Sequence, residues 1–218
     1  MKGLLMMNGY NMKVYLRQYL ILLVFFLIFG VSTRNSYYIM GMSLVVGLNI
    51  SFSSFSFEEA GGYAYLLSTP VTRRDMVRAK YLLQLAGAGF ILFCSGVGEL
   101  LSRLLTGQTE ESWLISLFSI LGIYFLFMGI LVPVAYRYGT EKARIVMIGM
   151  VAVPMLLVFL GAKLMQLSVL MRAMDGLSWL FVQEHASLYA GFFFLVCSVL
   201  IMGASYLLSV RIFEKTDF

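Results

Sequence analysis

Two adjacent glutamates, Glu58 and Glu59, stand beside a long apolar run and have the residue type used in metal-dependent hydrolysis. Catalytic zinc normally takes three protein ligands and a water in the fourth position. The sequence offers one histidine, His185, and two cysteines, Cys94 and Cys197, in different apolar runs. These residues cannot complete such a site, so we expect no metal, no enzyme activity and no disulfide. We interpret His185 as an interfacial polar residue at the start of the last apolar run.

Nucleotide chemistry also lacks its usual signature. The sequence contains no Gly-x-x-x-x-Gly-Lys-Ser/Thr stretch, the loop whose backbone N–H groups cradle nucleotide phosphates. We therefore expect no cofactor in this chain. If ATP powers the protein, ATP and Mg²⁺ must be bound by a separate polypeptide.

Glu99 is an acidic residue well inside an apolar run. Intramembrane carboxylates mark proton and ion pathways, which makes Glu99 a candidate for the substrate path. Arg103 follows four residues later, a spacing that favours a structural ion pair on one helix face, and both interpretations stay open. Cys94, Gly98 and Ser102 recur every four residues, a ridge of small side chains suited to close helix contact.

Composition identifies the elements that must carry these residues. Of the 218 residues, 61% are hydrophobic and 12% are charged, whereas soluble domains carry roughly 25% charged residues. Six runs approach the length of about 20 residues that a helix needs to cross a bilayer: 18–33, 37–57, 81–102, 113–135, 145–162 and 186–210. None alternates as a barrel strand would. We predict an all-α membrane protein, with six transmembrane helices in one domain over residues 1–218.

The segment before the first run is predicted to lie in the membrane interface. Residues 1–15 mix apolar side chains with lysines and asparagines, which is typical of an interfacial helix. The first run itself is short, with 16 residues between Arg17 and Arg34, but arginine side chains can snorkel at either end. No small-residue cleavage site follows, so we do not interpret this run as a signal peptide.

The distribution of lysine and arginine predicts the orientation. With six spans, twelve of these residues share the side of both termini: Lys2, Lys13, Arg17, Arg73, Arg74, Arg78, Lys80, Arg137, Lys142, Arg144, Arg211 and Lys215. Four lie on the other side: Arg34, Arg103, Lys163 and Arg172. Both termini are therefore predicted in the cytoplasm. The net charge of +5 is a topology signal, and no nucleic acid partner is expected because no loop offers a sizeable soluble domain.

The stretch "STPVTRRDMVRAKYL" between the second and third runs has the features of a defined helix start. Pro70 ends the preceding structure, and Thr72 with Asp75 three residues later forms a variant of the capping box. A helix is predicted to begin at Arg73. The segment is either a built contact element or a basic anchor for lipid phosphates.

The connection "PVAYRYGTEKARIVM" has similar signals. Pro133 should loosen the end of the fourth run, Gly139 permits a turn, and residues 140–144 can start the next helix. Tyr136 and Tyr138 fit an interfacial aromatic position.

"LLSTPVTRRDMVRAKYLL" and "PVAYRYGTEKAR", spaced as they are, resemble the permease subunits of type-2 ABC transporters. The similarity is to the short six-span Firmicutes permeases, which include exporters of amphipathic peptides such as phenol-soluble modulins. The beginning, "MKGLLMMNGYNMKVYL", and the ending, "SYLLSVRIFEKTDF", are also similar. Met7 and Asn8 depart from the family pattern, where a Lys-Asp-like pair is expected.

This resemblance implies an ATP-driven exporter in a bacterial cell membrane. Two permease chains, identical or paralogous, pair above two cytoplasmic ATPase subunits that bind ATP and Mg²⁺. The N-terminal helix and a coupling helix between spans two and three face the ATPase, and residues 163–185 form a re-entrant segment. The implied coupling residues are Ser68, Thr69, Pro70, Thr72, Arg73, Arg74 and Asp75. The implied second cytoplasmic loop contains Tyr136, Gly139, Glu141, Lys142 and Arg144.

Two other classes stay open. An ATP-independent channel or carrier would carry more intramembrane charge or matched inverted repeats, and Pro154 in the fifth run has no clear counterpart in the second. A non-transporting membrane scaffold would show no nucleotide-driven change when an ATPase is present.

The charge count makes a direct topological prediction. Cysteines introduced at Thr106 and Ser168 should react with an impermeant thiol reagent applied outside intact cells, and a cysteine at Thr140 should not. Labelling at Thr140 from outside would reverse the assigned orientation.

Overall fold

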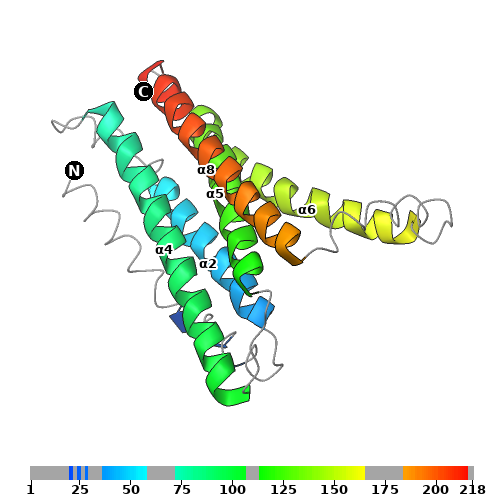
Figure 1. Cartoon of the computed structure of the whole chain (residues 1–218). Coiled ribbons are helices and arrows are strands. Elements are labelled where there is room, and N and C mark those ends of the chain that lie inside the picture. Colours follow the sequence, from blue (N-terminus) through cyan, green and yellow to red (C-terminus); the bar gives the residue numbers. More distant parts are fainter. Residues whose placement is uncertain are drawn as a thin grey trace.

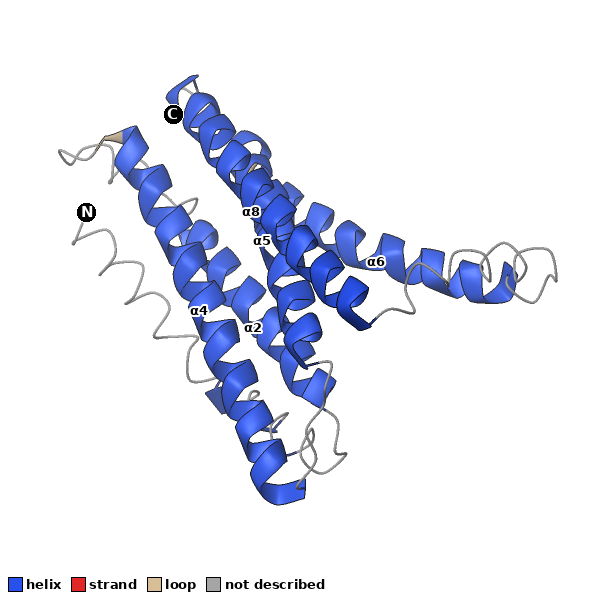
Figure 2. Ribbon diagram, in the orientation of Figure 1, coloured by secondary structure: helices blue, strands red, loops and turns tan. Residues whose placement is uncertain are grey.

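The computed structural model describes residues 20–21, 24–25, 28, 36–57, 72–106, 113–164 and 184–215. Their elements are the helices α2 (Ser36–Phe57), α4 (Arg73–Thr106), α5 (Trp113–Tyr138), α6 (Thr140–Leu164) and α8 (Glu184–Lys215). No strand occurs among these residues (Figure 2). The predicted all-α class is confirmed.

Three helices are long and apolar enough to cross a membrane: Arg73–Leu101 within α4, α5, and Leu188–Lys215 within α8. A shorter apolar stretch, Tyr38–Phe52, lies in α2. The chain is therefore a helical membrane protein. The run 18–33 is described only at five helical residues. The N-terminal helix at 1–15 and residues 165–183 of the predicted re-entrant segment lie outside the described residues, so these features and the six-span count stay predictions.

Helices α2, α4, α5 and α8 run side by side, and α6 diverges from them (Figure 1). The most extensive contact joins α5 to α8, followed by α2 to α4, while α6 packs chiefly on α5. The start of α4 and the end of α8 lie at the same end of the bundle (Figure 1).

Glycines let α5 and α8 approach closely. A Cβ at Gly122 would stand 2.5 Å from a ring carbon of Phe194, and one at Gly129 would stand 3.2 Å from Ile201. Gly98, one residue of the predicted small-residue ridge, has the same role between α4 and α2, because a Cβ there would lie 2.7 Å from Ile39. In a lipid environment, close packing of this kind is a main source of helix association.

Helix α4 is longer than the sequence suggests. The capped helix and the third apolar run form one continuous helix of 34 residues, with no separate coupling helix among the described residues. At 1.5 Å per residue this is about 50 Å, well beyond the about 30 Å hydrocarbon core. The helix is therefore long enough for its charged first turns to reach beyond the hydrocarbon as part of the same rod. Pro133 likewise does not end α5, which continues to Tyr138.

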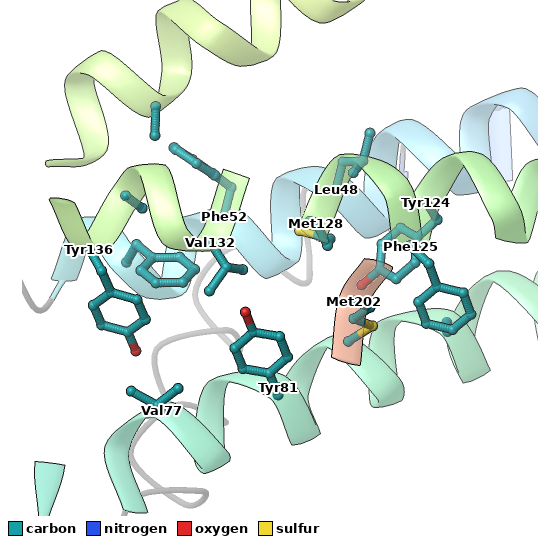
Figure 3. Close-up of a cluster of buried hydrophobic side chains, with 14 of the residues drawn as sticks. Leu48, Phe52, Val77, Tyr81, Tyr124, Phe125, Met128, Val132, Tyr136 and Met202 are labelled. Carbon is teal, nitrogen blue, oxygen red and sulfur yellow. The ribbon is translucent and has the colours of Figure 1, made fainter. Parts of the chain in front are cut away.

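Tyr124 lies among the buried apolar side chains of the core (Figure 3), where its hydroxyl joins a polar cluster that connects three helices. The Tyr124 hydroxyl of α5 donates towards the backbone and side-chain oxygens of Gln84 in α4, at 3.0 and 3.1 Å. The same oxygen lies 2.9 Å from the Ser51 hydroxyl of α2. All three residues are fully buried. Gly87 makes room for this arrangement, because a Cβ there would overlap the Tyr124 hydroxyl oxygen.

We expect Gly87→Ala to lower the free energy of unfolding of the detergent-purified protein by about 1–3 kcal/mol, the usual cost of overpacking. In a Tyr124→Phe background the obstructing oxygen is gone, so the same substitution should cost less than half as much. Gly89→Ala is the matched control on the same helix, since nothing lies within 4 Å of its added carbon. An equal cost of Gly87→Ala in both backgrounds would contradict this account.

Candidate functional site

The predicted helix cap at the start of α4 is confirmed. The Thr72 hydroxyl accepts the backbone N–H of Asp75 at 3.2 Å and donates to the Asp75 carboxylate at 2.7 Å. The Thr72 carbonyl accepts the N–H groups of Asp75 and Met76 at 3.0 and 3.2 Å. The carboxylate reaches the hydroxyl, so this is a variant of the capping box. It fixes where α4 begins.

Arg73 and Arg74, which follow the cap, bind the end of α8. Arg73 donates from Nη1 to the carbonyls of Phe213 and Glu214, at 3.1 and 3.0 Å. Arg74 donates from Nε to the Glu214 carboxylate at 2.6 Å. This chain itself therefore supplies acceptors for both arginines. We call these contacts, made by Arg73, Arg74, Phe213 and Glu214, the α4–α8 clamp.

Helix-end electrostatics explain the clamp. The last carbonyls of a helix have no partner within the helix, and they form its negative end. Arg73 supplies donors to two of them. Glu214 has the wrong charge for a helix C-terminus, and the guanidinium of Arg74 compensates it. Because this ion pair is exposed, with side-chain exposures of 66% and 40%, it contributes little to stability.

The contact between α4 and α8 continues below the clamp. The Tyr81 hydroxyl lies 2.7 Å from the Ser205 hydroxyl and 3.0 Å from that of Ser209, and all three side chains are buried. The rings of Tyr81 and Tyr206 meet edge to face, with centroids 5.3 Å apart. The two helices are thus held together over about two turns.

The second predicted element, the α5–α6 connection, is a tight turn. Gly139 has φ 87°, and its N–H donates to the Ala135 carbonyl at 3.0 Å, as in a left-handed helix cap. The expected turn at Gly139 is confirmed. Exposed charged side chains follow it: Glu141, Lys142 and Arg144. Thr140 is buried at 7% exposure, so a cysteine there would not react with the thiol reagent from either side of the membrane. Lys142 is exposed and is the better position for the labelling experiment.

Tyr136 does not occupy the interfacial position that the sequence predicts. It is buried at 5% exposure, with its ring centroid 4.9 Å from Phe213 and 5.6 Å from Phe55, so it is a core residue. Tyr138 is exposed, beneath the cations of Arg137 and Lys142. Phe213 therefore joins the two predicted cytoplasmic elements: its carbonyl receives Arg73, and its ring packs on Tyr136.

Ser68, Thr69 and Pro70 lie outside the described residues. Sequence reasoning missed Phe213 and Glu214. One signal was available for Glu214, because a carboxylate in the last turn of a helix opposes the helix dipole and calls for a cationic partner.

Glu99 lies at the opposite end of α4 and is buried at 4% exposure. Arg103 donates from Nε to its carboxylate at 3.0 Å, so the predicted i,i+4 pair is confirmed. An apolar hollow of about 150 Å³ adjoins the pair, lined also by Gly96, Leu100 and Trp113. Within the described residues, no group of three His, Cys, Asp or Glu side chains is placed to hold a metal ion.

Comparison with known protein families matches residues 3–214 to the model described as ABC-2 family transporter protein. Comparisons with curated proteins and with solved structures return no match. Since the matched region covers nearly the whole chain, the protein belongs to the ABC-2 transporter family.

Proposed function

We propose that the protein is the membrane permease subunit of an ATP-driven ABC exporter. ATP and Mg²⁺ are bound by a separate ATPase subunit, and a second permease chain, identical or paralogous, completes the pore. Membership of the ABC-2 family supports a permease subunit. The assembly lies in a bacterial cell membrane with both termini in the cytoplasm, as the excess of basic residues at one end favours.

The observation that carries the ATP-driven mechanism is the fixed start of α4. Thr72 and Asp75 cap a continuous 34-residue helix, and the α4–α8 clamp ties that end to α8. A displacement applied to this end therefore moves α4 and α8 together. Because α8 makes its most extensive contact with α5, the displacement reaches three helices of the bundle.

In this proposal, residues 68–75 form the ATPase contact. Among the described residues of this contact, Arg74 is the best placed to bind the ATPase, because its side chain is 66% exposed even though it bonds to Glu214. The α5–α6 turn adds the exposed residues Glu141, Lys142 and Arg144 at the same end of the bundle. Glu99 stays a substrate-path candidate, although its pairing with Arg103 favours a structural role.

The proposed cargo is an amphipathic peptide or another apolar compound. The spans carry few charges, and exposed apolar side chains cover much of α8, including Phe193, Leu200 and Leu207 at 69%, 67% and 61% exposure. A pathway bounded by such helices suits cargo that already partitions into lipid. The direction of transport, outward, follows the resemblance of the two cytoplasmic motifs to exporters.

Arg74→Ala and Glu214→Ala test the ATPase contact as a matched pair. Both substitutions remove the same exposed ion pair, so each should change folding little, and Arg74→Ala should cost slightly more because it leaves Glu214 uncompensated at the helix end. If Arg74 also binds the ATPase, Arg74→Ala alone should reduce ATPase co-purification at least tenfold, because truncating one charge of a pair buried in an interface weakens binding strongly. Equal ATPase retention by the two variants would leave Arg74 with a role inside the permease only.

Asp75→Asn separates the coupling role from a lipid anchor. The amide oxygen can still accept the Thr72 hydroxyl, so the cap persists while the negative charge is lost. A lipid anchor would be unaffected or improved by the more positive segment. We expect the variant to lose substrate-stimulated ATP hydrolysis, and unchanged stimulation would argue for the anchor.

The substrate class is tested in two assays. Deletion of the protein should increase the sensitivity of cells to amphipathic peptides, and such a peptide should raise the ATP turnover of the purified permease–ATPase assembly. A panel of peptides that changes neither sensitivity nor turnover would exclude this cargo.

A further inference from the structure

A groove of about 260 Å³ opens between α4 and α8, next to the α4–α8 clamp. Its lining consists of Arg78, Tyr81, Leu82, Leu85 and Tyr206. Arg78, Leu82 and Leu85 follow one face of α4, spaced by four and three residues. The groove therefore has a cationic end and an apolar length of about 10 Å between Arg78 and Leu85, at 1.5 Å per residue.

Arg78 follows Arg74 by one turn of α4 and, like Arg74, donates only its Nε–H in a hydrogen bond among the described residues. One N–H, from Nε, donates to the Tyr206 hydroxyl at 3.2 Å. Asp75 lies 3.8 Å from Nη1, which is too long for a hydrogen bond. A guanidinium has five N–H donors, and this side chain is 55% exposed. Arg78 thus presents donors and charge at the mouth of the groove.

The apolar wall of the groove is open to the surroundings of the protein. Leu82 and Leu85 are 44% and 54% exposed, and they lie within the membrane-spanning part of α4. Tyr81 forms a closed floor because its hydroxyl is held by Ser205 and Ser209. A ligand here must place an anionic group at Arg78 and an alkyl chain along the two leucines.

The size of the groove favours a lipid over a soluble ligand. Pockets that enclose a drug-sized molecule measure about 300–1,000 Å³, and this groove is smaller and open. The groove covers only part of an alkyl chain, so the rest of the ligand must lie in an apolar environment outside the protein. A phospholipid meets this condition because it remains in the bilayer. Phosphate diesters are good acceptors for the planar donors of arginine.

The charge of this end of the bundle selects the kind of lipid. Among the described residues it carries basic side chains at Arg73, Arg74, Arg78, Lys80, Arg137, Lys142, Arg144, Arg211 and Lys215, against the carboxylates Asp75, Glu141 and Glu214. This excess of positive charge attracts anionic headgroups. We propose that the α4–α8 groove is a binding site for an anionic phospholipid, with its phosphate on Arg78 and one acyl chain along Leu82 and Leu85.

The test uses the full chain purified in detergent, titrated with dioctanoyl phosphatidylglycerol or dioctanoyl phosphatidylcholine and read by native mass spectrometry. The parent should bind the anionic lipid about tenfold more tightly. Arg78→Gln should remove about tenfold of that affinity, since the substitution removes the positive charge and the guanidinium donors that would bind the phosphate. Leu85→Trp, which fills the groove, should weaken both lipids.

Arg137→Gln is the matched control, because Arg137 is exposed at the same end and lies over the Tyr138 ring, outside the groove. It should leave the lipid preference unchanged. Equal binding of both lipids by the parent, or an equal loss in the Arg137 and Arg78 variants, would overturn the proposal. So would a change of oligomeric state in Leu85→Trp with lipid binding intact, which would assign the groove to a second copy. The measurement needs no ATPase, so its result is independent of the proposed export function.

Discussion

The donation from Arg73 to the carbonyls of Phe213 and Glu214 is the interaction on which the rest of this end of the protein depends. It joins the start of α4 to the end of α8, two segments separated by about 140 positions in the sequence. The unpaired carbonyls of a helix C-terminus need donors, and a capped helix start places Arg73 where it supplies them. The ring of Phe213, fully buried against Tyr136, extends the same junction to α5.

The apolar part of the bundle must be stabilised differently, because lipid offers no hydrophobic gain for burying one helix against another. Two devices replace it. Glycines at Gly122 and Gly129 let the backbone of the neighbouring helix approach, and Gly98 makes room for the side chain of Ile39. Hydroxyl and amide groups bond across helices, as Tyr124 does with Gln84 and Ser51. Gly87 combines close packing with hydrogen bonding, because its missing side chain leaves room for the Tyr124 hydroxyl.

The sequence predicts the features that depend on local chemistry. The all-α class, the cap at Thr72, the turn at Gly139 and the pair of Glu99 with Arg103 follow from residue types at short spacings, and the structure contains each of them. It does not predict the clamp or the burial of Tyr136, because these depend on contacts between distant segments that have no local pattern. Pro133, expected to loosen the end of the fourth run, lies inside α5, which continues to Tyr138.

The arginines at the start of α4 illustrate why a charge count alone cannot assign roles. Counting lysines and arginines treats Arg73, Arg74 and Arg78 as equivalent contributions to orientation. In the structure, Arg73 neutralises a helix terminus and Arg74 neutralises a carboxylate, while Arg78 donates to the Tyr206 hydroxyl and lies 3.8 Å from Asp75. The three arginines therefore differ in what they contact: Arg73 and Arg74 join two helices of this protein, and Arg78 lines the groove between those helices.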